Sequence, residues 1–259
     1  MSDPALSPDN LRNITVKSPA LKGRGDITVF VPPGLDASAK LPLVLLLHGV
    51  YGSHWAWTGL GGVHKSALDL IQKGRIRPMI IGMPSDGLWG DGTGYVAHHG
   101  IDFENWILED VVDVIRECFP QAAATSPLFI GGLSMGGFGA LWLAAKHPER
   151  FAGVSAHSSV TDLTQLEGIV SEGSSLTKAG GTDQWSVFAW MLKHKKRLPA
   201  IRFDCGLDDH LLGQNRELRQ KLEQQGIPHR YEEFPGGHEW AYWREHIKDS
   251  LLFFEAQLD

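Results

Sequence analysis

The stretch GGLSMGGFGA, residues 131–140, places Ser134 among five glycines. It follows the apolar run 128–130 and precedes the helix-forming series ALWLAAKH, residues 140–147. Residues 132–136 match the pattern G-x-S-x-G, in which a serine stands on a sharp turn between a strand and a helix. In a chain with 30 glycines the pattern alone is weak evidence, because random order gives about 0.2 such matches. Its strand–turn–helix setting nevertheless predicts that Ser134 is a nucleophile.

Short β-type runs alternate with helical patterns along the chain. The central runs are apolar on both faces, as parallel strands covered on two sides are, whereas the first two runs predict an antiparallel pair. We therefore expect an α/β fold: a mostly parallel sheet of about eight strands with helices on both faces, and ligands at the carboxyl ends of the strands. The β-type runs cover residues 14–18, 26–32, 41–47, 78–84, 127–132, 151–156, 199–205 and 229–234. Helical spacing is found in the stripe Phe103, Ile107, Val111 and Ile115 and over 139–146, 185–195, 212–225 and 239–257.

Composition excludes several classes of protein. The chain has 259 residues, 42% of them hydrophobic, and a formal net charge of −6. This length suits one large α/β domain, residues 1–259. The charge leaves no basic footprint for nucleic acid, and no apolar run is long enough for membrane insertion. The polar start MSDPALSPDN lacks a signal-peptide pattern, which predicts a cytoplasmic location.

Two further features leave alternatives open. Residues 157–198, the longest stretch without a clear strand, form either a cap over the site or a surface excursion. The oligomeric state also stays open, a homo-oligomer included. Cys118 and Cys205 lie far apart and form no CxxC unit, so neither a disulfide framework nor a thiolate metal site is expected.

A serine hydroxyl needs a base to remove its proton and a carboxylate to orient that base. In a fold of this kind the acid and the histidine follow the serine in that order. His238 stands in PGGHEW, directly after a predicted strand and two glycines. The acid comes from CGLDDHLL, where the spacing does not choose between Asp208 and Asp209.

The developing oxyanion requires two backbone N–H donors. Met135, which follows the serine, supplies one, and the loop LLLHGVYGSHWAW supplies the other from Val50 or Tyr51. Tyr51, Trp55, Trp57 and Trp89 lie in loops after strands and are candidates for the substrate pocket, with ordinary packing as the alternative. No metal or other cofactor is expected, because His98 and His99 have no accompanying ligand pattern.

These catalytic segments together resemble the esterase D group of α/β-hydrolases, from about residue 14 to the C-terminus. That group includes S-formylglutathione hydrolases, short-chain carboxylesterases, feruloyl and acetylxylan esterases, and mycolyltransferases. The resemblance implies an α/β-hydrolase fold. It also favours Asp209 over Asp208, through the spacing G-x-x-D from Gly206, and Val50 over Tyr51.

The function expected from the resemblance is a serine carboxylesterase that hydrolyses short-chain or aryl esters of small molecules through an acyl-serine intermediate. Asp204, Cys205 and Gly206 depart from the D-Q-G of S-formylglutathione hydrolases, which leaves that activity as a minor alternative beside feruloyl or acetyl ester hydrolysis. An acyltransferase with the same triad is a further alternative. A non-catalytic binding protein is the last.

Overall fold

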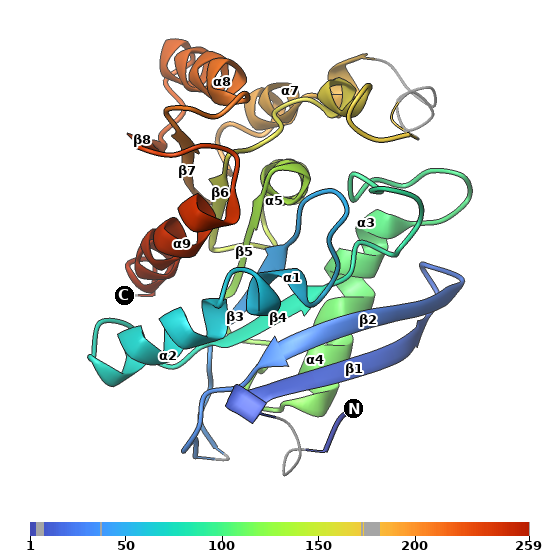
Figure 1. Cartoon of the computed structure of the whole chain (residues 1–259), viewed down its shortest axis with the longest axis vertical. Coiled ribbons are helices and arrows are strands. Elements are labelled where there is room, and N and C mark those ends of the chain that lie inside the picture. Colours follow the sequence, from blue (N-terminus) through green and yellow to red (C-terminus); the bar gives the residue numbers. More distant parts are fainter. Residues whose placement is uncertain (4–7, 37, 172, 174–181, 259) are drawn as a thin grey trace.

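One eight-stranded sheet organises the chain (Figure 1). The structure is a computed structural model that describes residues 1–3, 8–36, 38–171, 173 and 182–258. The spatial order of the strands is β1-β2-β4-β3-β5-β6-β7-β8, with β2 antiparallel to both of its neighbours and the other pairs parallel. The strands are β1 Leu11–Ser18, β2 Gly23–Phe30, β3 Leu43–Leu47, β4 Ile80–Pro84, β5 Leu128–Leu133, β6 Gly153–His157, β7 Ala200–Gly206 and β8 Arg230–Phe234. All eight predicted strands are present, so the α/β prediction is confirmed.

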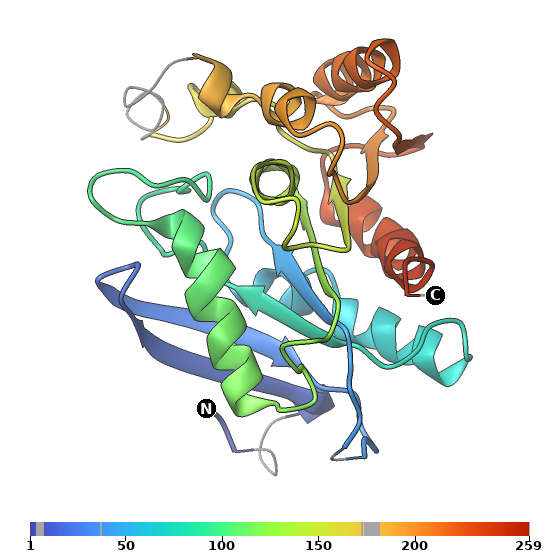
Figure 2. The ribbon, with the colours of Figure 1, turned by 180° about the vertical axis from the view of Figure 1, so that it is seen from behind.

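Helices cover both faces of the sheet, and each face has its own hydrophobic core. Helices α2 and α9 pack together on one face, while α4, α5, α7 and α8 lie on the other, which Figure 2 shows from behind. Residues of every central strand are buried, as a sheet covered on two sides requires. The helices are α1 Ala56–Gly59, α2 Val63–Gln72, α3 Phe103–Asn105, α4 Val111–Cys118, α5 Met135–Lys146, α7 Val187–Lys193, α8 Leu212–Gln224 and α9 Trp240–Glu255.

The helices differ from the sequence prediction in three places. The predicted stripe 103–115 is one helical stretch interrupted by the π-turn Trp106–Asp110, and all four stripe residues are buried. Helix α5 begins four residues earlier than expected, directly after Ser134, because the glycines that look turn-forming pack tightly inside the helix. Helices α1 and α2 were not predicted, although Val63, Ala67 and Leu70 of α2 form a buried face at helical spacing.

The segment after β6 is an excursion with little regular structure before α7. It contains the short helices Leu163–Leu166 and Thr182–Trp185, and α7 matches the helical piece expected around 185–195. Residues 172 and 174–181, inside the predicted cap, lie outside the described residues. Across the described ranges, the helices are too short or too polar to span a membrane.

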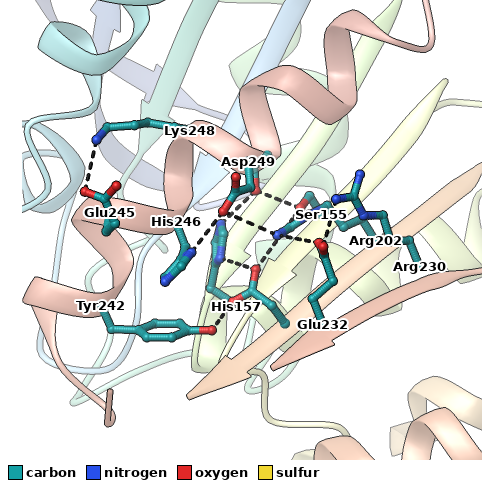
Figure 3. A network of polar contacts seen from close by, with 12 residues as sticks. Ser155, His157, Arg202, Arg230, Glu232, Tyr242, Glu245, His246, Lys248 and Asp249 are labelled. Carbon is teal, nitrogen blue, oxygen red and sulfur yellow. Dashed lines mark hydrogen bonds and ion pairs between the residues drawn. The ribbon is translucent and has the colours of Figure 1, made fainter. Parts of the chain in front are cut away.

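A charged cluster is buried between α9 and the strands β6 and β7 (Figure 3). The Arg202 guanidinium lies 2.6 Å from the Asp204 carboxylate, which also meets His157 Nδ1 at 2.8 Å and accepts from the Tyr242 hydroxyl at 2.7 Å. His157 Nε2 contacts Ser250 of α9 at 2.7 Å. Burial alone would raise the pKa of Asp204, but His157, Arg202 and Tyr242 outweigh it and hold this pKa at about 2. The cluster fixes α9 to the sheet at two points, Tyr242 in its first turn and Ser250 further along the helix.

Candidate active site

Ser134 occupies a strained turn between β5 and α5. Its backbone has φ 54° and ψ −120°, a left-handed conformation that costs free energy in a residue other than glycine. A Cβ on Gly132 would lie 2.2 Å from the backbone oxygen of Gly136, and one on Gly136 would lie 2.3 Å from the oxygen of Leu47. Only glycine fits at these two positions. The Ser134 N–H donates to the backbone oxygen of His157 at 3.0 Å, which holds the turn against β6.

His238 lies between Ser134 and Asp209. Its Nε2 is 3.0 Å from Ser134 Oγ, and its Nδ1 is 2.9 Å and 3.1 Å from the two carboxylate oxygens of Asp209. An ionised carboxylate only accepts hydrogen bonds, so Nδ1 carries the proton and Nε2 is left to accept from the serine hydroxyl. The three side chains come from the loops after β5, β7 and β8, at the carboxyl edge of the sheet.

Asp209, and not Asp208, faces the histidine. Asp209 is 6% exposed, whereas Asp208 is an exposed residue. Burial would raise the pKa of Asp209, but hydrogen bonds from His238, the Leu211 N–H and Ser158 hold it below its usual value. The acid is therefore ionised at neutral pH.

Backbone hydrogen bonds join the acid loop to the base loop. The N–H of Leu207 donates to Phe234 O and that of Asp208 to Gly236 O, both at 2.9 Å. A Cβ on Gly206 would lie 2.2 Å from Gly236 O, so glycine is required where the two loops touch. The two loops thus continue the pairing of β7 with β8 and keep Asp209 and His238 at a fixed separation.

The loop after β3 passes beside the serine. A Cβ on Gly49 would lie 3.3 Å from Ser134 Cβ, and Val50 lines the cavity next to the serine. The Tyr51 N–H donates to Asp91 O at 3.0 Å, so this N–H is already used within the protein. The Val50 N–H is then the stronger of the two candidate donors, beside that of Met135 at the start of α5.

His48 supports this loop instead of acting as a second base. It is buried, its Nδ1–H donates to Gly49 O at 2.7 Å, and its Nε2 accepts from the Asp86 N–H at 3.1 Å. Both ring nitrogens are thereby engaged with backbone in the neutral tautomer. Burial lowers the pKa of His48 and keeps the ring uncharged.

A cavity of about 500 Å³ opens at Ser134 and His238. Tyr51 and Trp55, two of the four pocket candidates, lie on its wall. Trp57 does not: it is buried beneath the loop and its Nε1 donates to Leu47 O at 3.0 Å. Trp89 also lies elsewhere, packed against the rings of His98 and His99. These two pocket predictions are wrong because a loop position after a strand does not fix the direction of a side chain.

Sequence reasoning missed the other half of the wall. The first turn of α9 supplies Trp240 and Trp243, and the end of α1 is followed by Leu60. The Trp243 ring stands edge-on to His238, with ring centroids 5.0 Å apart, and its Nε1 donates to Ser158 Oγ at 3.2 Å. The signal was present in PGGHEWAYW, where both tryptophans closely follow the predicted base.

Comparison with known proteins places this chain among esterases. A family model described as "Putative esterase" matches residues 18–254. An acetyl esterase from Caldicellulosiruptor saccharolyticus is 28% identical over 240 residues, 86% of each chain. The solved structure of a ferulic acid esterase superposes with a TM-score of 0.79 at 26% identity, covering 96% of this chain and 98% of the other. An S-formylglutathione hydrolase from Staphylococcus aureus has the same TM-score at 21% identity, covering 94% and 97%, and shows the shared fold.

Proposed function

The chain belongs to the esterase family whose model it matches and is a carboxylic ester hydrolase of the α/β-hydrolase fold, and on this premise we propose how its residues carry out the reaction. Ser134 Oγ attacks the ester carbonyl while His238 Nε2 accepts the hydroxyl proton. Asp209 orients the imidazole and stabilises its cationic form. The N–H groups of Met135 and Val50 hold the oxyanion of the tetrahedral intermediate.

The second half of the reaction repeats the first with water. Collapse of the tetrahedral intermediate breaks the ester C–O bond, and His238 returns its proton to the departing alcohol. Water then attacks the acyl-serine with His238 as base, and the carboxylic acid leaves as Ser134 recovers its proton. No metal or other cofactor enters this sequence.

The proposal rests on two hydrogen bonds that link the three side chains: Asp209 to His238 Nδ1 at 2.9 Å, and His238 Nε2 to Ser134 Oγ at 3.0 Å. We expect Ser134→Ala to lower the turnover of p-nitrophenyl acetate by at least about 10⁴-fold with an unchanged melting temperature. A fluorophosphonate should label the wild-type protein but not the variant. Ser66→Ala in α2 is the matched control and should keep full turnover. Substantial turnover by Ser134→Ala would refute the mechanism.

The cavity favours an uncharged, short-chain or aryl ester. Its wall is largely aromatic and aliphatic. Among the residues that the structure describes, its lining contains neither lysine nor arginine but does include Glu239. Glutathione carries carboxylates, so its thioesters find no cationic partner among these lining residues. We expect p-nitrophenyl acetate or methyl ferulate to be hydrolysed with a higher kcat/KM than S-formylglutathione. The reverse order would support the thioester activity named for the staphylococcal structure.

Two broader expectations are part of the proposal. The chain forms one catalytic domain, since one sheet carries all three triad loops. Limited proteolysis tests this, and a stable, active fragment lacking either end of the sheet would contradict it. A cytoplasmic location stays a prediction of the sequence, and fractionation of the producing cells tests it.

A further inference from the structure

His210 stands beside the acid and the base without taking part in their contacts. Its side chain is 61% exposed, its ring centroid is 4.5 Å from that of His238, and its Nδ1 is 3.7 Å from Asp209 Oδ1. One nitrogen or oxygen atom from each of Asp209, His210 and His238 lies within 4.8 Å of the others. The reaction proposed above has no use for this second imidazole.

Two imidazoles and one carboxylate are a ligand set that zinc and neighbouring divalent transition metals bind. Ligand atoms about 2.0–2.1 Å from a tetrahedral zinc ion lie about 3.3 Å from one another. His238 Nδ1 is already 3.1 Å from Asp209 Oδ1, and His210 Nδ1 is 3.7 Å from the same oxygen. These two edges are therefore within about half an ångström of the spacing in a zinc site, and the third, between the two imidazoles, is no longer than 4.8 Å.

The surroundings of the three side chains suit a metal ligand set. The Leu211 N–H donates to Asp209 Oδ1 at 2.8 Å and fixes the carboxylate, as a supporting hydrogen bond does for metal ligands. Ser134 Oγ at His238 Nε2 similarly fixes the imidazole ring. The exposure of His210 provides a route from solvent and leaves room for water as the fourth ligand.

We propose that Asp209, His210 and His238 form an inhibitory site for a divalent transition-metal ion of the zinc class. The metal takes the Nδ1 lone pair of a neutral His238, so the ring proton resides on Nε2. An Nε2 that carries a proton donates to Ser134 Oγ and does not accept its proton, and the serine loses its base. A protein with the metal bound therefore cannot carry out the hydrolysis proposed above. The inhibitory effect, unlike the binding itself, rests on that proposed function.

Zinc titration of tag-free protein during p-nitrophenyl acetate hydrolysis tests the proposal. We expect inhibition by micromolar zinc that EDTA reverses, and an inhibition constant at least about tenfold weaker for His210→Ala, whose activity without metal stays near wild type. His99→Asn, at another exposed histidine, and Cys118→Ser, at a free thiol, should be inhibited like the wild type. Equal inhibition of the wild type and His210→Ala, or none of the wild type, would overturn the proposal.

Calorimetry separates this proposal from the proposed function. Ser134→Ala keeps all three ligands, so it should bind one zinc ion per chain whether or not the wild type hydrolyses esters. Adding His210→Ala to it should weaken binding at least about tenfold. Zinc binding that His210→Ala leaves unchanged, or no binding at all, sinks the metal site. An inactive wild type that shows the expected binding pattern sinks only the esterase mechanism.

Discussion

Replacing Arg202 with methionine removes the buried cation between β7 and α9 and leaves its carboxylate partners behind. Arg202 is fully buried and lies 2.6 Å from Asp204 and 3.2 Å from Glu232. Removing one partner of a buried ion pair costs about 3–5 kcal/mol, because the remaining charge is left uncompensated. Asp204 keeps its contacts with His157 and Tyr242, so the lower end of that range, about 3 kcal/mol, applies here.

In a chain of this size a loss of about 3 kcal/mol lowers the melting temperature by about 6–12 °C. Differential scanning calorimetry at pH 7 measures it. Arg216→Met is the matched control, because Arg216 makes a two-pronged ion pair with Glu233 but is half-exposed, and its melting temperature should stay within about 2 °C of wild type. If the melting temperature of Arg202→Met also stays within about 2 °C of wild type, burial does not make the loss of this cation costly.

Three further predictions concern single positions. The folded-state pKa of Asp204, about 2, lies below its ordinary value of 3.8. Its ionised form therefore contributes about 2 kcal/mol to the free energy of unfolding above pH 4, and this contribution is lost as the pH falls from 4 to 2. Asp204→Asn should flatten the dependence of stability on pH over that window in an acid-unfolding experiment. Asp209→Asn should lower kcat by about 10³-fold or more, because the orienting carboxylate is lost, whereas Asp208→Asn should change kcat less than about twofold. Equal effects of the two substitutions in steady-state assays would contradict the assignment of Asp209 as the acid. Gly132→Ala places a Cβ 2.2 Å from a backbone oxygen and should abolish fluorophosphonate labelling, whereas Gly213→Ala in α8, with nothing within 4 Å, should raise the melting temperature by about 1–4 °C.

Much of the fold was predictable because local pattern and tertiary burial agree. Runs such as LPLVLLL are apolar on both faces, and the structure places them in the covered centre of the sheet. Helix α5 began earlier than predicted because Gly136 and Gly137 are required by close contacts with neighbouring backbone and Ser159, information that a propensity scale does not contain.

The triad was partly predictable for a related reason. Ser134 and His238 each follow a predicted strand and stand next to glycines. Glycines mark tight backbone turns, so the sequence itself indicates these two positions. Asp208 and Asp209 are adjacent, and only the backbone geometry of their loop decides which of them faces the histidine. The direction of a tryptophan side chain is likewise set by its packing partners: Trp57 packs against His157 and Trp240, far away in the sequence, and Trp89 against His98 and His99.

The charged cluster beneath α9 has a signal in the sequence. Ser155 and His157 alternate on β6, and Arg202 and Asp204 alternate on its neighbour, directly opposite one another in the register. Polar residues spaced by two in otherwise apolar strands indicate one polar stripe across the sheet. His157 is fully buried and lies at the centre of this stripe.

The hydrogen-bonded junction of the acid and base loops makes them one cooperative unit at the edge of the sheet. Strand β8 is one of the two edge strands of the sheet, and separating it from β7 breaks the bonds from Leu207 and Asp208 to Phe234 and Gly236. Asp209 and His238 then lose their alignment in one event, while Ser134 stays anchored between β3 and β6 in the centre. Separating β8 from β7 would therefore misalign the acid and the base while the nucleophile's own turn keeps its contact with His157.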